Sequence, residues 1–232
     1  MNDTIEAKLY ADWNGKEYSS ETVEYSVATY IYSMLGSTTN AEFRTMLVDM
    51  LRYGSAAQVY TKYNTSNLVD SKLTAEQAAW GTASVRNLST VKNIPSATAS
   101  DSAKWVGMSL YLDSKVAIRG YFDIPSKDGV YVEVADENGN VYAKITAEDF
   151  TEVTGPENTP VVSFVYDGLN FAQMSKTVKL TVCDSVGNKL SGTAVYSIES
   201  YVYSTQSSTV SGLADLVKAM IVFGDASNAY AN

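Results

Sequence analysis

Two stretches of the chain place apolar residues at steps of three and four, the spacing that gathers side chains on one face of an α-helix. The first stretch spans residues 43–57 and the second spans residues 213–227. The sequence therefore predicts two long amphipathic helices. Their candidate N-caps are Thr39 or Asn40 for the first helix and Ser208 or Ser211 for the second.

Elsewhere apolar and polar residues alternate, as in β-strands that bury one face. Residues 105–123 read as two strands around a turn at Asp113 and Ser114, and residues 129–145 as a hairpin with its turn at 137–140. Further strands are expected at 161–171, 178–183 and 189–197. The spacing of turn residues favours an α+β protein containing an antiparallel β-sandwich of about seven strands with C-terminal packed helices.

One pattern of residues occurs twice. Residues 25–33 (YSVATYIYS) match residues 196–204 (YSIESYVYS), and residues 46–60 match residues 216–230, with Met, Gly, Ala and Tyr at corresponding places. Further upstream, IEAKLYADWNGK from Ile5 resembles VKLTVCDSVGNK from Val178. Each copy reads as a hairpin, a short helix and a long helix, so the chain contains an internal repeat.

The repeat divides the chain into three predicted parts. Residues 1–63 form a partial repeat, residues 64–103 a linker with one short helix, and residues 104–232 a complete module. The short helix begins with a capping box of Thr74 and Gln77. An isolated hairpin is marginal in water. We therefore expect the first copy to dock on the second copy, directly or through the long helix of the first. The strands that would precede the first copy are expected to lie outside this sequence or to be replaced.

Charge and hydropathy exclude two classes of partner. The net charge of −9 and a pI near 4.5 leave no large basic face for nucleic acid. No apolar run approaches the length of a spanning helix, so no membrane insertion is expected, and Met1 is not followed by the apolar core of a signal peptide. If the protein is exported, the chain as printed starts after its signal.

The candidate chemistry is sparse. The chain has no histidine and one cysteine, Cys183, which excludes the Ser-His-Asp and Cys-His mechanisms, most zinc sites and an internal disulfide. No nucleophile-elbow or phosphate-loop motif occurs. Glu148 and Asp149 read as the first turn of a short helix. We therefore predict a protein that is not an enzyme and has no cofactor.

Several phrases resemble a known type of module. They are TVEYSVATYIYSML, LVDMLRYGSAAQVYTKYNTSNLVD, WVGMSLYLDSKVAIRGYFDI and LVKAMIVFGDASNAY. They are distributed between residues 22 and 230 and resemble a recurrent uncharacterised module of large secreted or surface proteins from anaerobic Gram-positive gut bacteria, where it occurs beside dockerin, leucine-rich-repeat and Ig-like domains. The resemblance extends over nearly the entire chain. The resemblance implies an extracellular or cell-surface location and carries no catalytic residues.

Aromatic residues are the candidate ligand contacts, because 17 tyrosines are many for one chain. The repeated tyrosines at 25, 30 and 32, and at 196, 201 and 203, are better explained by packing between helix and sheet. The unrepeated aromatics are the better candidates for a ligand face, although strand aromatics usually fill cores. They are Trp13, Tyr18, Trp80, Tyr111, Tyr121, Tyr131 and Tyr142.

Asp-containing turns at 12–15, 136–140 and 184–188 are superficially similar to calcium loops. None provides ligands out to a bidentate Glu at the twelfth position, and Asp, Asn and Gly are what hairpin turns require. No metal site is predicted, although surface modules also bind calcium at irregular sites.

Three functions follow from these patterns. The first is a non-catalytic structural or adhesive module that spaces or contacts partners within a larger protein. The second is a carbohydrate-binding module with exposed aromatics on a sheet face, and the third a hydrolase that uses carboxylates alone. The expected partners are a polysaccharide or a host or cell-surface protein.

Overall fold

The computed structural model describes residues 1, 3–112 and 115–232, which form two compact units. The first comprises Met1–Val85 with Ser208–Asn232, and the second Arg86–Ser207. Antiparallel sheets and helices occur together, which confirms the α+β class. The last helix belongs to the first unit because it packs against the long helix of the first copy.

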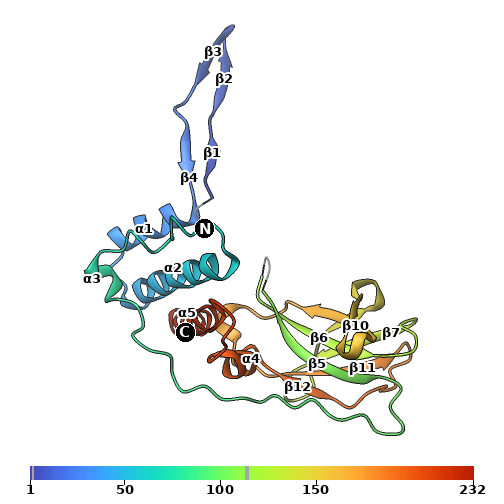
Figure 1. Ribbon diagram of the computed structural model, residues 1–232. Helices are drawn as coiled ribbons and strands as arrows, with labels where there is room; N and C mark the ends of the chain where they lie inside the picture. The colour runs from blue at the N-terminus through green and yellow to red at the C-terminus, as the bar shows by residue number, and fades with distance from the viewer. Residues whose placement is uncertain (2, 113–114) are drawn as a thin grey trace. The chain divides into compact units, whose positions relative to one another are not determined.

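A narrow two-stranded ribbon opens the first unit and runs away from its helices (Figure 1). Both strands of the predicted first hairpin are interrupted, so the ribbon consists of two short antiparallel pairs, β1 with β4 and β2 with β3. Every residue of the four strands is exposed. Their bounds are β1 Ile5–Ala7, β2 Tyr10–Trp13, β3 Lys16–Ser19 and β4 Val23–Tyr25.

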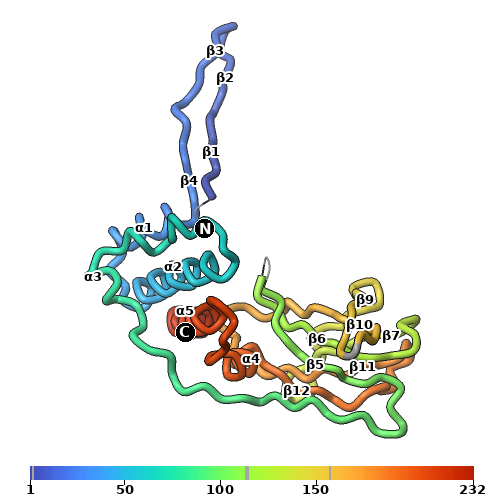
Figure 2. Tube along the Cα trace, viewed as in Figure 1, coloured from blue at the N-terminus to red at the C-terminus, as the bar shows by residue number. Residues whose placement is uncertain are grey.

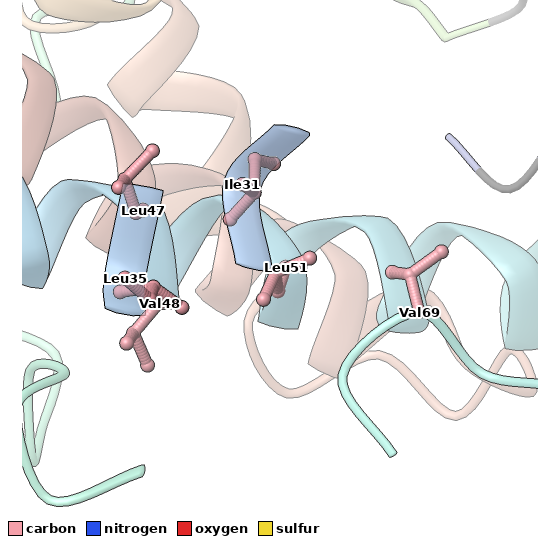
Figure 3. Packing of buried hydrophobic residues seen from close by; sticks show 6 residues of the cluster. All are labelled: Ile31, Leu35, Leu47, Val48, Leu51 and Val69. Carbon is pink, nitrogen blue, oxygen red and sulfur yellow. The ribbon is translucent and has the colours of Figure 1, made fainter. Parts of the chain in front are cut away.

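Helices α1 (Val27–Ser37) and α2 (Ala41–Thr61) enclose a small apolar core with the loop that follows α2 (Figure 3). Asn40 caps α2 by accepting the N–H of Phe43 at 2.7 Å, one of the two expected caps. The short helix α3 (Ala75–Ala78) has the predicted capping box. The buried core residues are Ile31, Leu35, Leu47, Val48, Leu51 and Val69.

Helix α5 (Leu213–Ala231) packs along α2 in an internally symmetric way. The equivalent rings of Tyr53 and Phe223 stack at 5.9 Å, and Phe43 of α2 stacks on Tyr230 of α5 at 4.9 Å. At the opposite end, the N-cap Gly212 of α5 lies against Tyr60, so that an added Cβ would meet the Tyr60 Cα at 3.1 Å. The two copies of the long helix therefore meet antiparallel, each presenting the same face.

The predicted caps Ser208 and Ser211 of α5 were wrong. Gly212 is the N-cap, with φ 76° and no side-chain cap. Its close approach to the α2 backbone leaves no room for a serine side chain, and glycine adopts this left-handed conformation without strain.

Buried polar side chains of α2 fix the segments that follow it. Asp49, which is 0% exposed, accepts the N–H and the hydroxyl of Thr82, the latter at 2.6 Å, and lies 3.3 Å from Arg52 Nη1. Further along α2, the Gln58 side-chain amide accepts the Val69 N–H at 2.9 Å and donates to two loop carbonyls. These contacts hold residues 64–82 against the helix.

The second unit contains two four-stranded antiparallel sheets, in the orders β5-β6-β10-β9 and β12-β11-β7-β8. The finer prediction of one sandwich of about seven strands is not confirmed, because the eight described strands of this unit form small sheets of four strands each. The expected strand at 189–197 shrinks to three residues, and β9 was not predicted. The bounds are β5 Lys104–Tyr111, β6 Ala117–Asp123, β7 Val130–Ala135, β8 Val141–Thr146, β9 Thr151–Thr154, β10 Pro160–Tyr166, β11 Val178–Asp184 and β12 Ala194–Tyr196.

Short helical turns connect these strands, and β9 lies beside β10 (Figure 2). The turn predicted at Asp113 and Ser114 lies outside the described residues. The helical turn expected at Glu148 and Asp149 is present as the 3-10 helix η1. The bounds are η1 Ala147–Asp149, η2 Pro156–Asn158, η3 Phe171–Gln173 and α4 Ile198–Thr205.

The extended segment after residue 85 is attached to β12 and α4. Asn93 bridges Val195 of β12, and the Arg86 guanidinium donates to Glu199 of α4 at 2.6 Å and 3.0 Å. Burial alone would raise the pKa of Glu199, but hydrogen bonds from Arg86 and from the Ser89 N–H lower it to about 2. Part of the predicted linker is thus an integral edge of the second unit.

The two sequence copies share their local structure. Ser26 and Ser197 each cap the following helix by accepting the N–H three residues on, at 3.1 Å. The strand pairing is also the same: Ile5 lies opposite Tyr25 in the first copy, and Val178 lies opposite Tyr196 in the second. Tyr25 is nevertheless exposed and Tyr196 buried, so the predicted shared packing role of these tyrosines was wrong.

No helix in the described ranges has the length and apolar character that a membrane span requires.

Replacement of Asp49 by Ala tests the polar network of α2. It leaves the Thr82 N–H and hydroxyl without their acceptor and removes the carboxylate beside Arg52, whose guanidinium keeps the carbonyls of Thr82 and Ala78. We therefore expect the free energy of unfolding of the first unit to fall by about 2 kcal/mol, discounted because Arg52 is partly exposed. Chemical denaturation followed by circular dichroism measures this loss. Glu42→Ala, on the exposed first turn of the same helix, should cost less than about 1 kcal/mol. An equal effect of both changes would contradict the role of Asp49.

Candidate functional site

The seven aromatic residues singled out in the sequence do not form one row. Trp13 and Tyr18 lie on the ribbon and Trp80 lies beside α2 in the first unit. In the second unit, Tyr111 and Tyr121 belong to one sheet, and the other two aromatics, Tyr131 and Tyr142, to the other sheet. The structure therefore contains several small aromatic surfaces, which differ in exposure and in the side chains around them.

Trp13 and Tyr18 share one face of the β2–β3 hairpin, because Trp13 pairs with Lys16 and Tyr18 with Ala11 in the antiparallel register. The indole of Trp13 is 70% exposed and the ring of Tyr18 is 49% exposed. The Lys16 ammonium lies 5.4 Å from the centre of the Tyr18 ring. The hairpin tip thus presents two accessible rings beside a cation.

Trp80 serves packing. The Arg44 guanidinium lies 4.3 Å from the centre of the Trp80 ring, and that ring also packs on the core of the first unit. The backbone carbonyl of Trp80 accepts the hydroxyl of Thr45 at 2.8 Å. These contacts use the ring faces that a ligand would need.

Tyr111 and Tyr121 lie on one face of the β5–β6 pair, with Arg119 between them in the register. The Arg119 guanidinium lies 4.8 Å over the Tyr111 ring, and the Tyr121 hydroxyl is 3.2 Å from Ser109 Oγ. Arg119 Nε is buried and has no hydrogen-bond acceptor within the described residues. Both rings are half-buried, so this face presents edges rather than a flat platform.

A cleft of about 640 Å³ in the second unit gathers the richest set of side chains. It is formed by β8, the end of β10 and the residues that follow these strands, together with Lys115 and Lys176, which precede β6 and β11. Tyr142 is the one sequence candidate among its lining residues, and Tyr131 lies next to it through Lys144. The side chains that carry its chemistry are Tyr142, Tyr166, Lys115, Lys144, Lys176, Asp149 and Asp167.

Cations lie against the aromatic rings of this cleft. The Lys176 ammonium is 4.5 Å from the centre of the Tyr142 ring, and the Lys144 ammonium is 4.5 Å from that of Tyr131. A hydrogen bond with Tyr142 raises the pKa of Lys176, and burial raises the pKa of Tyr166, so both keep their protons at neutral pH. The cleft can therefore donate hydrogen bonds and positive charge to an anionic group.

One carboxylate of the cleft is paired with a lysine. Asp167 forms an ion pair with Lys115, whose hydrogen bond lowers the pKa of Asp167. That pairing leaves Lys144 and Lys176 as the cations directed at the rings. Tyr166 and Lys176 were missed in the sequence, because they reach Tyr142 of β8 from β10 and from the segment before β11, and no local spacing signals this meeting.

The Asp-containing turns are satisfied by their own backbones. Asp136 accepts the N–H groups of Asn138 and Asn140, each at 2.8 Å, and Asp184 accepts those of Val186 and Asn188. A side-chain hydrogen bond from the Asn four residues on lowers the pKa of each carboxyl. Within the described residues, no three His, Cys, Asp or Glu side chains come together as metal ligands do.

Comparison of the chain with protein-family models, with curated proteins and with solved structures finds no match.

Removal of Trp13 tests the exposure of the hairpin tip. We expect the W13F variant to lower the acrylamide quenching constant of the tryptophan fluorescence, since the remaining indoles are half-buried and Trp105 donates its Nε1–H to Gly192 at 2.7 Å. The matched variant W105F should raise the average constant. Unchanged quenching in W13F would mean that another part of the chain covers this ring.

Proposed function

We propose that this chain is a non-catalytic structural or adhesive segment of a larger extracellular or cell-surface protein, where it spaces modules and contacts partners. The observation that carries the proposal is the internal repeat, in which two copies share the same strand register and the same serine caps. A repeated element that has equal local structure and no shared reactive residues is typical of architecture rather than of catalysis.

The packing of the two long helices supports this proposal. Equivalent rings meet at the centre of the α2–α5 pair, Tyr53 on Phe223, so the copies associate through the same face of each. In a chain that carries further copies, the same face would join neighbouring modules. The net charge of −9 favours solubility of such a surface protein.

The second unit is proposed to be a β-sandwich. Both of its sheets bury alternate residues: Val132 and Val134 of β7 are 0% exposed, as is Phe122 of β6. Two antiparallel sheets that each bury one apolar face can cover both faces by packing against each other face to face.

The location of the protein is directly testable in the cells that produce it. Brief trypsin treatment of intact cells should release peptides of this chain together with known surface proteins and without cytosolic markers. Recovery in the culture medium would also agree with the proposal. Detection only after cell lysis would contradict the extracellular assignment.

A carbohydrate-binding role is the second candidate, and the cleft at Tyr142 favours it. Tyr142 is 41% exposed, and Lys176 and Lys144 bring positive charge to the same place. Tyrosine rings pack against sugar faces, while ammonium groups pair with carboxylates. The ligand class that fits this set is an acidic polysaccharide.

Affinity electrophoresis with polygalacturonate tests this second role. The chain should be retarded, and the Y142A and K176A variants should each weaken the retardation about fivefold, as expected for loss of roughly 1 kcal/mol. Tyr203→Ala is the matched control, because that tyrosine is 45% exposed on α4 and does not line the cleft. Absence of retardation, or an equal loss in the control, would remove the cleft as a glycan site.

A further inference from the structure

We propose that the ribbon of residues 5–25 is an acceptor for a partner β-strand, supplied by a β-sheet segment that is built like residues 104–166 and lacks a β11–β12 hairpin of its own. This inference deepens the proposed modular function and rests on it. We infer the kind of partner from the second copy of the repeat, where β7 already pairs with the equivalent hairpin.

The first observation is a systematic difference in burial between the copies. Five apolar positions of the first copy are 45% to 79% exposed, whereas their equivalents in the second copy are at most 1% exposed. The exposed residues are Ile5, Leu9, Val23, Tyr25 and Val27, and their equivalents are Val178, Val182, Ala194, Tyr196 and Ile198. The sequence thus keeps the apolar character of a buried hairpin where the structure provides no cover.

The hairpin tip is the internal control for this comparison. Trp13 aligns with Val186, and the two residues are 70% and 79% exposed. Exposure at the tip is therefore a property of both copies, and the difference lies in the stem of the ribbon and at the start of α1.

The second observation is an open backbone edge. In the second unit, β11 pairs with β12 on one side and with β7 on the other. The equivalent strand β1 pairs with β4, and within the described residues its other edge carries no strand. A two-stranded ribbon is marginal in water, and an open edge next to apolar side chains is a template for strand addition.

The register of β7 on β11 shows how such a strand would lie. Val182 faces Val132 and Thr181 faces Glu133 in the second unit. Transferred to the first copy, Leu9 would face the valine, and Lys8, which aligns with Thr181, would face the glutamate. The first copy thus carries a lysine where a β7-like strand carries an acid, so the charges are complementary.

The exposed stem is continuous with the apolar start of α1. Tyr25 ends β4 and Val27 begins the helix, so the uncovered surface extends from the ribbon toward the small core of the first unit. A partner sheet seated there would extend an existing core rather than create an isolated contact.

A second copy of this chain does not provide the required strand. Its β7 already pairs on both edges, with β11 and with β8. The occupant is therefore a segment in which a β7-like strand has a free edge, and self-association of this chain is an alternative that the experiment can detect.

The test uses the full chain, labelled with ¹⁵N, and the synthetic peptide GVYVEVAD, which has the sequence of residues 129–136. Addition of the peptide should shift the amide resonances of residues 5–11. The L9K variant should weaken binding at least about tenfold, since it removes one buried leucine contact. Leu9 is 79% exposed, so this change leaves the fold intact. The W13S variant, altered at the tip, should bind as the unchanged chain does.

A control peptide that has lysine in place of the valines at positions 132 and 134 should not bind. Three results would overturn the proposal: equal binding of the two peptides, shifts outside residues 5–25, or light scattering that shows a dimer dissociated by L9K. None of these results bears on the cell-surface location, which the trypsin experiment tests separately, so the two proposals fail independently.

Discussion

Strand pairing is the constraint on which the rest of this structure depends. A β-strand is stable in water only when its backbone groups are paired along both edges or the open edge is protected, and when its apolar face is covered. The chain meets this requirement in the second unit, where β11 lies between two neighbours. The equivalent strand of the first unit, β1, has the same register and, among the residues that the structure describes, one neighbouring strand. The difference between the two copies is a difference in partners rather than in local sequence.

The long helices that follow the two hairpins bury their apolar faces against other parts of the described chain. The long helices α2 and α5 cover each other, and α2 in addition buries Asp49 and Gln58 as hydrogen-bonding centres for the segments after it. The first unit thus has a core and a polar network that do not involve the ribbon. This arrangement explains how a fully exposed hairpin can be attached to an otherwise well-packed helical unit.

The sequence predicted what depends on local spacing. The two long helices, the capping box at Thr74, the hairpin of β7 and β8 and the repeat itself follow from periodicity and turn residues. The cap at Gly212 and the assignment of α5 to the first unit were missed, because both depend on the close approach of α2. The cleft around Tyr142 was predicted only in part, since Tyr166 and Lys176 reach it from distant parts of the chain. Burial of Tyr196 and exposure of Tyr25 could not be distinguished, because the same local sequence is covered in one copy and uncovered in the other.

Amide hydrogen exchange is the most direct measurement of the central claim, that the first hairpin is an incomplete version of the second. The amides of residues 5–13 and of residues 178–186 occupy equivalent positions and can be compared within one sample. If the first hairpin is incomplete, the first set exchanges at close to the rate of an unstructured chain, while the second set is protected to nearly the stability of the second unit. Equal and strong protection of both sets would show that the ribbon is already covered and that the first hairpin is not an incomplete version of the second.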